Sequence, residues 1–158
     1  MANNFKVKDV VFAEDSYYKT QKVEIGGKNF ETPIKALDLK RNIGSIQTPT
    51  TIKGLNEYYK IFNSKSIANL RTTNREHEIN NEINRAFKRY SSDNEVNLCF
   101  SEFEDDKIPN KEELEYLTNL SYVHSDITPL PLLPRVAKSV TATNFDNYHN
   151  CSLKRVRR

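Results

Sequence analysis

The first third of the chain carries the alternating hydrophobic and polar pattern of β-strands. Residues 5–12 (FKVKDVVF) alternate loosely, and two further strand-like runs lie on either side of Gly26 and Gly27. Both glycines can adopt a positive φ, which the two-residue turn of a β-hairpin requires. The pattern therefore predicts an N-terminal antiparallel β segment over residues 1–30.

After this segment the pattern changes, because strand-like runs begin to alternate with runs of helical period. The predicted strands are residues 31–37, 66–72, 95–103 and 120–127. The predicted helices are residues 51–63, 73–90, a segment that begins at 110, and 135–156. A strand followed by a helix, four times over, is typical of βα units on a parallel sheet, so we expect an α/β fold.

Capping residues indicate where two of these helices begin. Thr73 with Glu76 and Asn110 with Glu113 both have the spacing of a capping box, in which two side chains satisfy backbone N–H groups reciprocally. Apolar side chains then recur at helical spacing behind each box: Ile79, Ile83, Phe87 and Tyr90 in one helix, and Leu114, Leu117 and Leu120 in the other.

Composition and cysteine content limit the class of protein. The chain has 158 residues, of which 37% are hydrophobic and 28% charged, which fits one folded domain. No apolar run reaches the roughly 20 residues of a membrane span, and the N-terminus lacks a signal-peptide core. Cys99 and Cys151 lie too far apart in sequence to suggest a disulfide framework or a zinc motif, so we expect a cytoplasmic protein.

The charge is concentrated at the C-terminus. The formal net charge is +3, and four cations lie within the last five residues, in a basic tail over 151–158. Such a tail is either a solvated end or a weak, nonspecific phosphate-binding segment. No glycine-rich nucleotide fingerprint follows any predicted strand.

Several segments, in order along the chain, resemble the queuine and archaeosine tRNA-guanine transglycosylases. They are NFETPI (29–34), TTIKGLNEYY (50–59), SIANLRTT (66–73) and SDITPLP (125–131). Members of this family are (β/α)₈ barrels with an N-terminal antiparallel sheet. They exchange guanine for a 7-deazaguanine base by breaking and re-forming an N-glycosidic bond. The resemblance implies the same fold and chemistry for residues 20–150.

The chain is too short to form the whole barrel that the resemblance implies. A (β/α)₈ barrel takes about 250 residues, so four βα units over residues 31–150 amount to half of a TIM-type barrel. Half a barrel exposes two parallel edge strands. The chain is therefore a fragment of a longer enzyme, a homo- or hetero-oligomer, or an open sheet, and the sequence leaves these alternatives open.

The resemblance also suggests which residues bind substrate. Asp126 falls on the aspartate that holds the edge of the base, Thr128 on the threonine of the same motif, and Asn69 on the family's asparagine. Ser101 aligns with a serine that follows the third strand. Taken by itself, Asp126 also fits a turn closed by Thr128 ahead of Pro129, and Asn69 has the same two interpretations.

The catalytic residues of the family are largely missing. Phe100 stands where the first catalytic aspartate is expected, and Glu102 or Glu104 is the candidate replacement. The family's nucleophile and its zinc ligands belong to segments beyond residue 158, so we expect no cofactor and no activity of this chain alone. Of the histidines, His124 is a candidate neighbour of Asp126, whereas His77 and His149 are expected on helix surfaces.

Two functions of different class therefore follow. The first is a transglycosylase-like protein that recognises guanine or 7-deazaguanine in tRNA or DNA, incomplete as an enzyme. The second is a non-catalytic nucleic-acid-binding or assembly subunit with the same fold. An unrelated α/β domain is the third and least specific interpretation.

Overall fold

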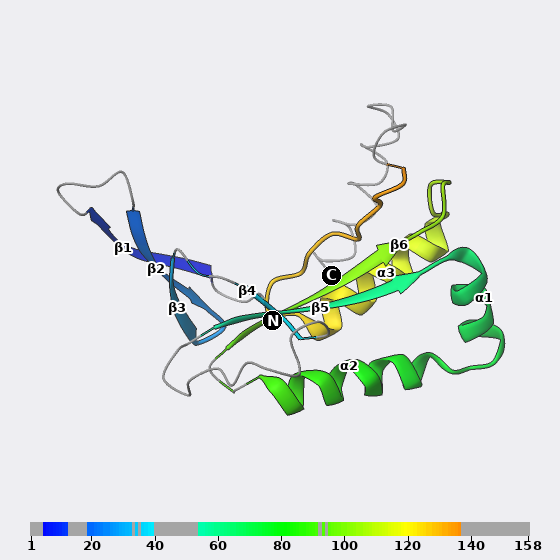
Figure 1. Ribbon diagram of the computed structural model, residues 1–158, viewed down its shortest axis with the longest axis horizontal. Coiled ribbons are helices and arrows are strands. Elements are labelled where there is room, and N and C mark those ends of the chain that lie inside the picture. Colours follow the sequence, from blue (N-terminus) through cyan, green and yellow to red (C-terminus); the bar gives the residue numbers. More distant parts are fainter. Residues whose placement is uncertain are drawn as a thin grey trace.

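The computed structural model describes residues 5–12, 19–32, 34, 36–39, 54–91, 93 and 95–136 (Figure 1). These residues form two three-stranded sheets and three helices. None of the described helices is both long and apolar enough to cross a membrane.

The N-terminal strands form an antiparallel sheet in the order β1-β2-β3. Its strands are β1 (Phe5–Phe12), β2 (Lys19–Ile25) and β3 (Lys28–Thr32). Ile25 pairs with Lys28, which leaves Gly26 and Gly27 as the turn, with φ of 56° and 85°. Two positive φ values are what a type I′ hairpin needs, so the predicted antiparallel segment is confirmed.

The second sheet is parallel, with the order β4-β5-β6. Its strands are β4 (Ala36–Asp38), β5 (Leu55–Phe62) and β6 (Val96–Phe103). The helices are α1 (Ser64–Thr72), α2 (Glu76–Tyr90) and α3 (Lys111–His124). The predicted α/β class and the strand at 95–103 are confirmed. The described residues contain three parallel strands rather than the four that were predicted.

All three helices pack on one face of the parallel sheet. Tyr58 and Phe62 of β5 share that face with Cys99 and Phe103 of β6, because Tyr58 pairs with Cys99 and Phe62 with Phe103. The apolar core forms between these side chains and the helices, and its helical members are Ile67, Ile83, Phe87, Leu117 and Leu120. No helix of the described residues lies on the opposite side of the sheet, which we call the helix-free face.

Residues 125–132 follow the outer edge of β6. The Cys99 N–H donates to Ser125 Oγ (2.7 Å), the Leu132 N–H donates to the Ser101 carbonyl (2.8 Å), and the Phe103 N–H donates to the Leu132 carbonyl (2.8 Å). Leu132 forms a parallel bridge with Glu102, so α3 is a crossover between β6 and a short fourth extended segment.

The prolines at 129 and 131 have a physical role at this edge. Leu132 directs both its N–H and its C=O toward β6, so the backbone of Pro131 faces the other way. Proline has no N–H, so Pro131 cannot donate a ladder hydrogen bond on the side away from β6.

Three predicted elements are wrong. The predicted strand at 66–72 lies in α1, and most of the predicted strand at 120–127 is the last turn of α3, which ends at His124. The described part of the predicted helix at 51–63 is β5. Tyr58 and Phe62 fit both a helical period and strand alternation. Lys60 lies between them on the same face of the strand, and its charge interrupts the apolar alternation that would predict a strand. Lys60 can lie on this face because Glu82 neutralises its charge.

The capping predictions had mixed outcomes. The Asn110–Glu113 box is confirmed, with hydrogen bonds of 2.9 and 2.7 Å. The Thr73–Glu76 box is wrong, because Thr73 is the C-cap of α1 and its hydroxyl donates to the Asn69 carbonyl (2.7 Å). Most of the helix predicted at 135–156 lies outside the described residues, as do His149, Cys151 and the basic tail.

Candidate functional site

The structure does not bring the predicted substrate-binding residues together. Asp126 lies beside the amino end of β6, where its N–H donates to the Asn97 carbonyl (2.9 Å). Its Oδ2 accepts from the Asn97 N–H (2.8 Å) and from Lys28 Nζ (2.7 Å). Asp126 therefore ties the segment after α3, and the hairpin sheet that carries Lys28, to the start of β6.

The other predicted ligands lie in different surroundings. Ser101 is fully buried on the helix-covered face, where its hydroxyl donates to the Leu117 carbonyl (3.0 Å). Asn69 is exposed on α1, which follows the carboxyl end of β5, whereas Asp126 lies at the amino end of β6. Thr128 is half-buried between Asp126 and the Leu132 bridge. Asn69 and Asp126 are therefore at opposite ends of the parallel strands.

Glu102, the candidate catalytic residue, lies on the helix-free face. Because Ser101 points into the core under α3, strand alternation directs Glu102 to the opposite side. Glu102 is half-buried near the carboxyl end of β6 and pairs in register with Ile61. Its carboxylate makes no hydrogen bond or ion pair with another residue in the described part of the chain.

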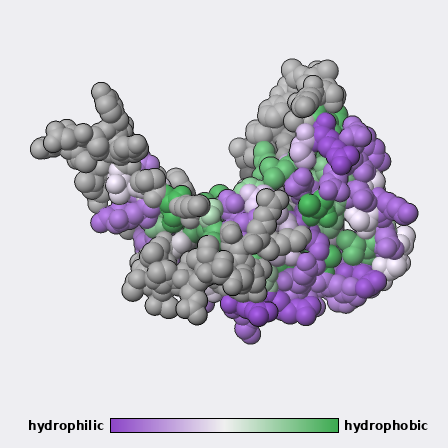
Figure 2. Space-filling view, viewed as in Figure 1, coloured by the Kyte–Doolittle hydropathy of each residue, from purple (hydrophilic) through white to green (hydrophobic). Residues whose placement is uncertain are grey.

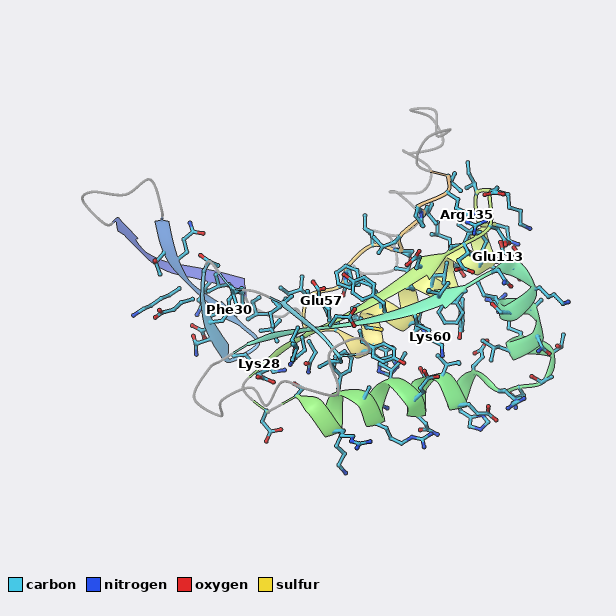
Figure 3. All side chains as sticks on the ribbon, viewed as in Figure 1. Lys28, Phe30, Glu57, Lys60, Glu113 and Arg135 are labelled. Carbon is cyan, nitrogen blue, oxygen red and sulfur yellow. The ribbon has the colours of Figure 1, made fainter. Side chains whose placement is uncertain are left out.

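Further acidic and aromatic side chains share this face with Glu102. Register places Asp38 of β4 beside Glu57 of β5, and Tyr59 of β5 beside Phe100 of β6. All of these residues are half-buried. Figure 3 shows Glu57 and Lys60 on opposite sides of β5, with Lys60 on the side of α2. We call these five residues (Asp38, Glu57, Tyr59, Phe100 and Glu102) the acid–aromatic cluster.

Direct contacts hold the middle of the cluster in place. The Tyr59 and Phe100 rings stack with centroids 4.8 Å apart and planes inclined by 9°. The Tyr59 hydroxyl donates to Glu57 Oε2 at 2.9 Å, which fixes the position of that carboxylate. The stack lies two residues along the strands from both Glu57 and Glu102, about 7 Å from each.

This arrangement suits a flat ligand with hydrogen-bond donors on its edge. Neighbouring strands are about 4.8 Å apart, so the register places the carboxylates of Asp38 and Glu57 on adjacent strands of the same face. Aromatic faces attract planar rings, and carboxylates accept paired N–H groups strongly. No group of three or more His, Cys, Asp or Glu residues in the described ranges has an arrangement that would hold a metal ion.

The sequence contained a signal for this cluster that a wrong element assignment hid. Glu57 and Tyr59 are two positions apart, so they share a face in a strand but not in a helix. The helix that the sequence predicts over residues 51–63 would place Glu57 and Tyr59 on different faces. Phe100, which stands where the resemblance to the transglycosylases implies an aspartate, is one half of the aromatic stack.

Glu82 and His124 are polar groups on the helix-covered face that have hydrogen-bond partners, whereas the buried hydroxyl of Thr118 in α3 has none among the described residues. Glu82 of α2 accepts from the Tyr58 hydroxyl (2.6 Å) and from Lys60 Nζ (2.6 Å). Burial and the carboxylate of Glu82 raise the pKa of Tyr58. Burial raises the pKa of the Cys99 thiol to about 12, which makes it unreactive. His124 is 9% exposed, its Nε2 lies 2.8 Å from Asn80 Oδ1, and burial lowers its pKa.

Comparison with known proteins provides no relative. Neither a protein-family model, nor a curated protein, nor a solved structure matches this chain.

Proposed function

We propose that the chain is an incomplete (β/α)₈ barrel of the transglycosylase type that binds a guanine or 7-deazaguanine base of tRNA or DNA. The base would lie on the helix-free face. The observation that carries this proposal is the Tyr59–Phe100 stack with Glu57 on one side of it and Glu102 on the other.

The topology of the parallel sheet supports the barrel part of the proposal. The strands follow chain order, and the described helices pack on one face. A (β/α) barrel has this arrangement, whereas a doubly wound sheet reverses its strand order and carries helices on both faces. In this interpretation the helix-free face corresponds to the inside of the barrel.

The chemistry of the cluster supports recognition of a base. A base that extends the aromatic stack gains about 1–3 kcal/mol. Guanine presents its N1–H and its 2-amino group on one edge, and a carboxylate such as Glu57 can accept both. Glu102, on the other side of the stack, would then face the glycosidic bond.

Base exchange by this chain alone is not expected. Glycosyl transfer needs a carboxylate nucleophile and a second group that handles the proton. Glu57 and Glu102 are four residues apart along the ladder, about 13 Å, so they cannot act on the same atom. Within the acid–aromatic cluster, Glu102 is the carboxylate on the side of the stack where the sugar would lie.

Calorimetric titration with 7-deazaguanine and adenine tests the proposal. We expect 7-deazaguanine to bind, and adenine, which lacks the paired donors, to bind at least tenfold more weakly. Glu57→Gln removes the charge and Phe100→Leu removes one stacked ring, and each should weaken binding about tenfold, the equivalent of 1–2 kcal/mol. Glu31→Gln, an exposed acid on β3, is the matched control. Equal affinity for the two bases would reject the proposal.

The non-catalytic nucleic-acid-binding subunit is the second candidate. It is favoured by the full burial of Ser101 and by the engagement of Asp126 with Lys28, because neither residue is free to act on a substrate. A labelled-guanine exchange assay on tRNA and on DNA separates the two functions. Exchange that is lost in Glu102→Gln supports an enzyme, and base binding without exchange supports the subunit.

A further inference from the structure

The outer side of α2 carries an open hollow of about 280 Å³. Its described lining residues, Asn81, Asn84, Arg85 and Lys88, follow the i, i+3, i+4, i+7 spacing of a single helical stripe. This stripe is separate from the one that packs into the core through Ile83 and Phe87. Hydrophilic side chains cover the lower edge of the view in Figure 2, where α2 lies in Figure 1.

The charges along α2 are arranged unevenly. Its carboxylates are each paired with a cation: Glu76 with Arg71 (3.7 Å), Glu78 with Arg75 (2.7 Å) and Glu82 with Lys60 (2.6 Å). Arg85 and Lys88 have no carboxylate partner among the described residues, and Arg85 uses its Nε on the Asn81 carbonyl (3.1 Å). The second half of the helix is therefore positively charged, and the hollow lies within that half.

We propose that this hollow binds phosphate groups of a nucleic-acid backbone. A guanidinium, an ammonium and two amide groups are the side chains that contact phosphate oxygens in nucleic-acid complexes. The helix dipole accounts for a cation in the last turn, such as Lys88, but not for two asparagines beside Arg85. The identity of the partner rests on the proposed function, in which the protein binds tRNA or DNA.

Fluorescence anisotropy with a labelled 12-nucleotide polyuridine tests this site in the full chain. The probe contains no guanine, so it reports backbone binding separately from base recognition. In the double variant Arg85→Gln/Lys88→Gln we expect about tenfold weaker binding at 50 mM salt. The slope of log K against log salt should become shallower by about 1.4, because each lost contact to single-stranded phosphate removes about 0.7.

The control variant is Lys65→Gln/Lys111→Gln, which removes two exposed cations from α1 and α3. It should change affinity by less than threefold and leave the slope unaltered. An unchanged slope in Arg85→Gln/Lys88→Gln, an equal loss in the control, or a loss confined to Lys154→Gln/Arg155→Gln in the basic tail would overturn the site. The affinity for 7-deazaguanine should not change in Arg85→Gln/Lys88→Gln. The two assays therefore distinguish an error in the proposed base-binding site from an error in the proposed phosphate-binding site.

Discussion

Neighbouring residues of β6 lie on opposite faces of the sheet and therefore have different roles. Phe100 and Glu102 face the helix-free side, whereas Ser101 between them is buried against Leu117 and Ser121 of α3. Ser101 therefore stabilises the contact between sheet and helix, and its neighbours are half-buried on the helix-free face. Adjacent residues in sequence thus belong to different environments, because strand alternation separates them.

His124 should make stability depend on pH. Burial lowers its pKa in the folded state below the usual 6.5, so the unfolded chain binds a proton first as the pH falls. The contribution of His124 is therefore complete above pH 6.5 and decreases below it, until the folded histidine also becomes protonated. Denaturant titrations of wild type and His124→Gln should diverge between pH 6.5 and pH 5, with wild type losing more stability.

The matched control for that measurement is His77→Gln, because His77 is exposed on α2. Its curve should run parallel to that of wild type. If wild type and His124→Gln showed the same pH dependence, His124 would not be titrating as its burial implies.

At the scale of elements, helix ends were predictable where the cap is local. In α3 the Asn110 side chain accepts from the Glu113 N–H, and the Glu113 carboxylate accepts from the Asn110 N–H. In α1 the equivalent pair is Asn63 with Ser66, a box that the prediction of a strand at 66–72 concealed. The box at Asn110 therefore predicted a helix start correctly, whereas the same spacing at Thr73 and Glu76 did not, because Thr73 ends α1 and α2 has no side-chain cap.

Loss of the α3 cap should destabilise the protein measurably. Asn110→Ala removes the acceptor for the Glu113 N–H and should lower the free energy of unfolding by about 1 kcal/mol. Asn110→Asp keeps an acceptor at the same place and should retain wild-type stability or exceed it. Chemical denaturation measures both, and a loss of similar size in the two variants would contradict the capping role.

At the scale of the whole molecule, the hairpin sheet contacts the parallel sheet at the amino end of β6 (Figure 1). Val23, Ile25 and Phe30 form an apolar cluster with Val96. Beside it, Lys28 of β3 bonds to Asp126, whose side chain is 23% exposed. The interface therefore combines a small apolar contact with one shielded ion pair.

We expect Asp126→Ala to lower stability and to leave base binding intact. The change leaves the Asn97 N–H and the Lys28 ammonium without the carboxylate, which should cost about 1–3 kcal/mol. Thermal unfolding should shift down by several degrees, while the affinity for 7-deazaguanine stays within twofold of wild type. A folded Asp126→Ala protein that no longer binds the base would instead assign Asp126 to the ligand, as the resemblance to the transglycosylases implies.

The sequence by itself determined those features whose signal is local. Gly26-Gly27 specified the hairpin turn, Asn110 and Glu113 specified a helix start, and the alternation over 95–103 specified β6. Each depends on backbone preferences or hydrogen bonds within a few residues, so no distant contact was needed to predict it.

The tertiary structure decided what depends on distant partners. Residues 55–62 form a strand because β4 and β6 pair with both of its edges and Glu82 neutralises Lys60, which no local pattern reveals. The same pairing places Glu57 and Tyr59 beside Asp38 and Phe100, and so creates the acid–aromatic cluster. The sequence motif predicts Asp126 at the carboxyl end of a strand. In the structure, Asn97 and Lys28 instead hold it beside the amino end of β6. Local preferences left helix and strand nearly equal in these segments. Strand pairing and side-chain partners 20 to 100 residues away in sequence then decided which conformation forms.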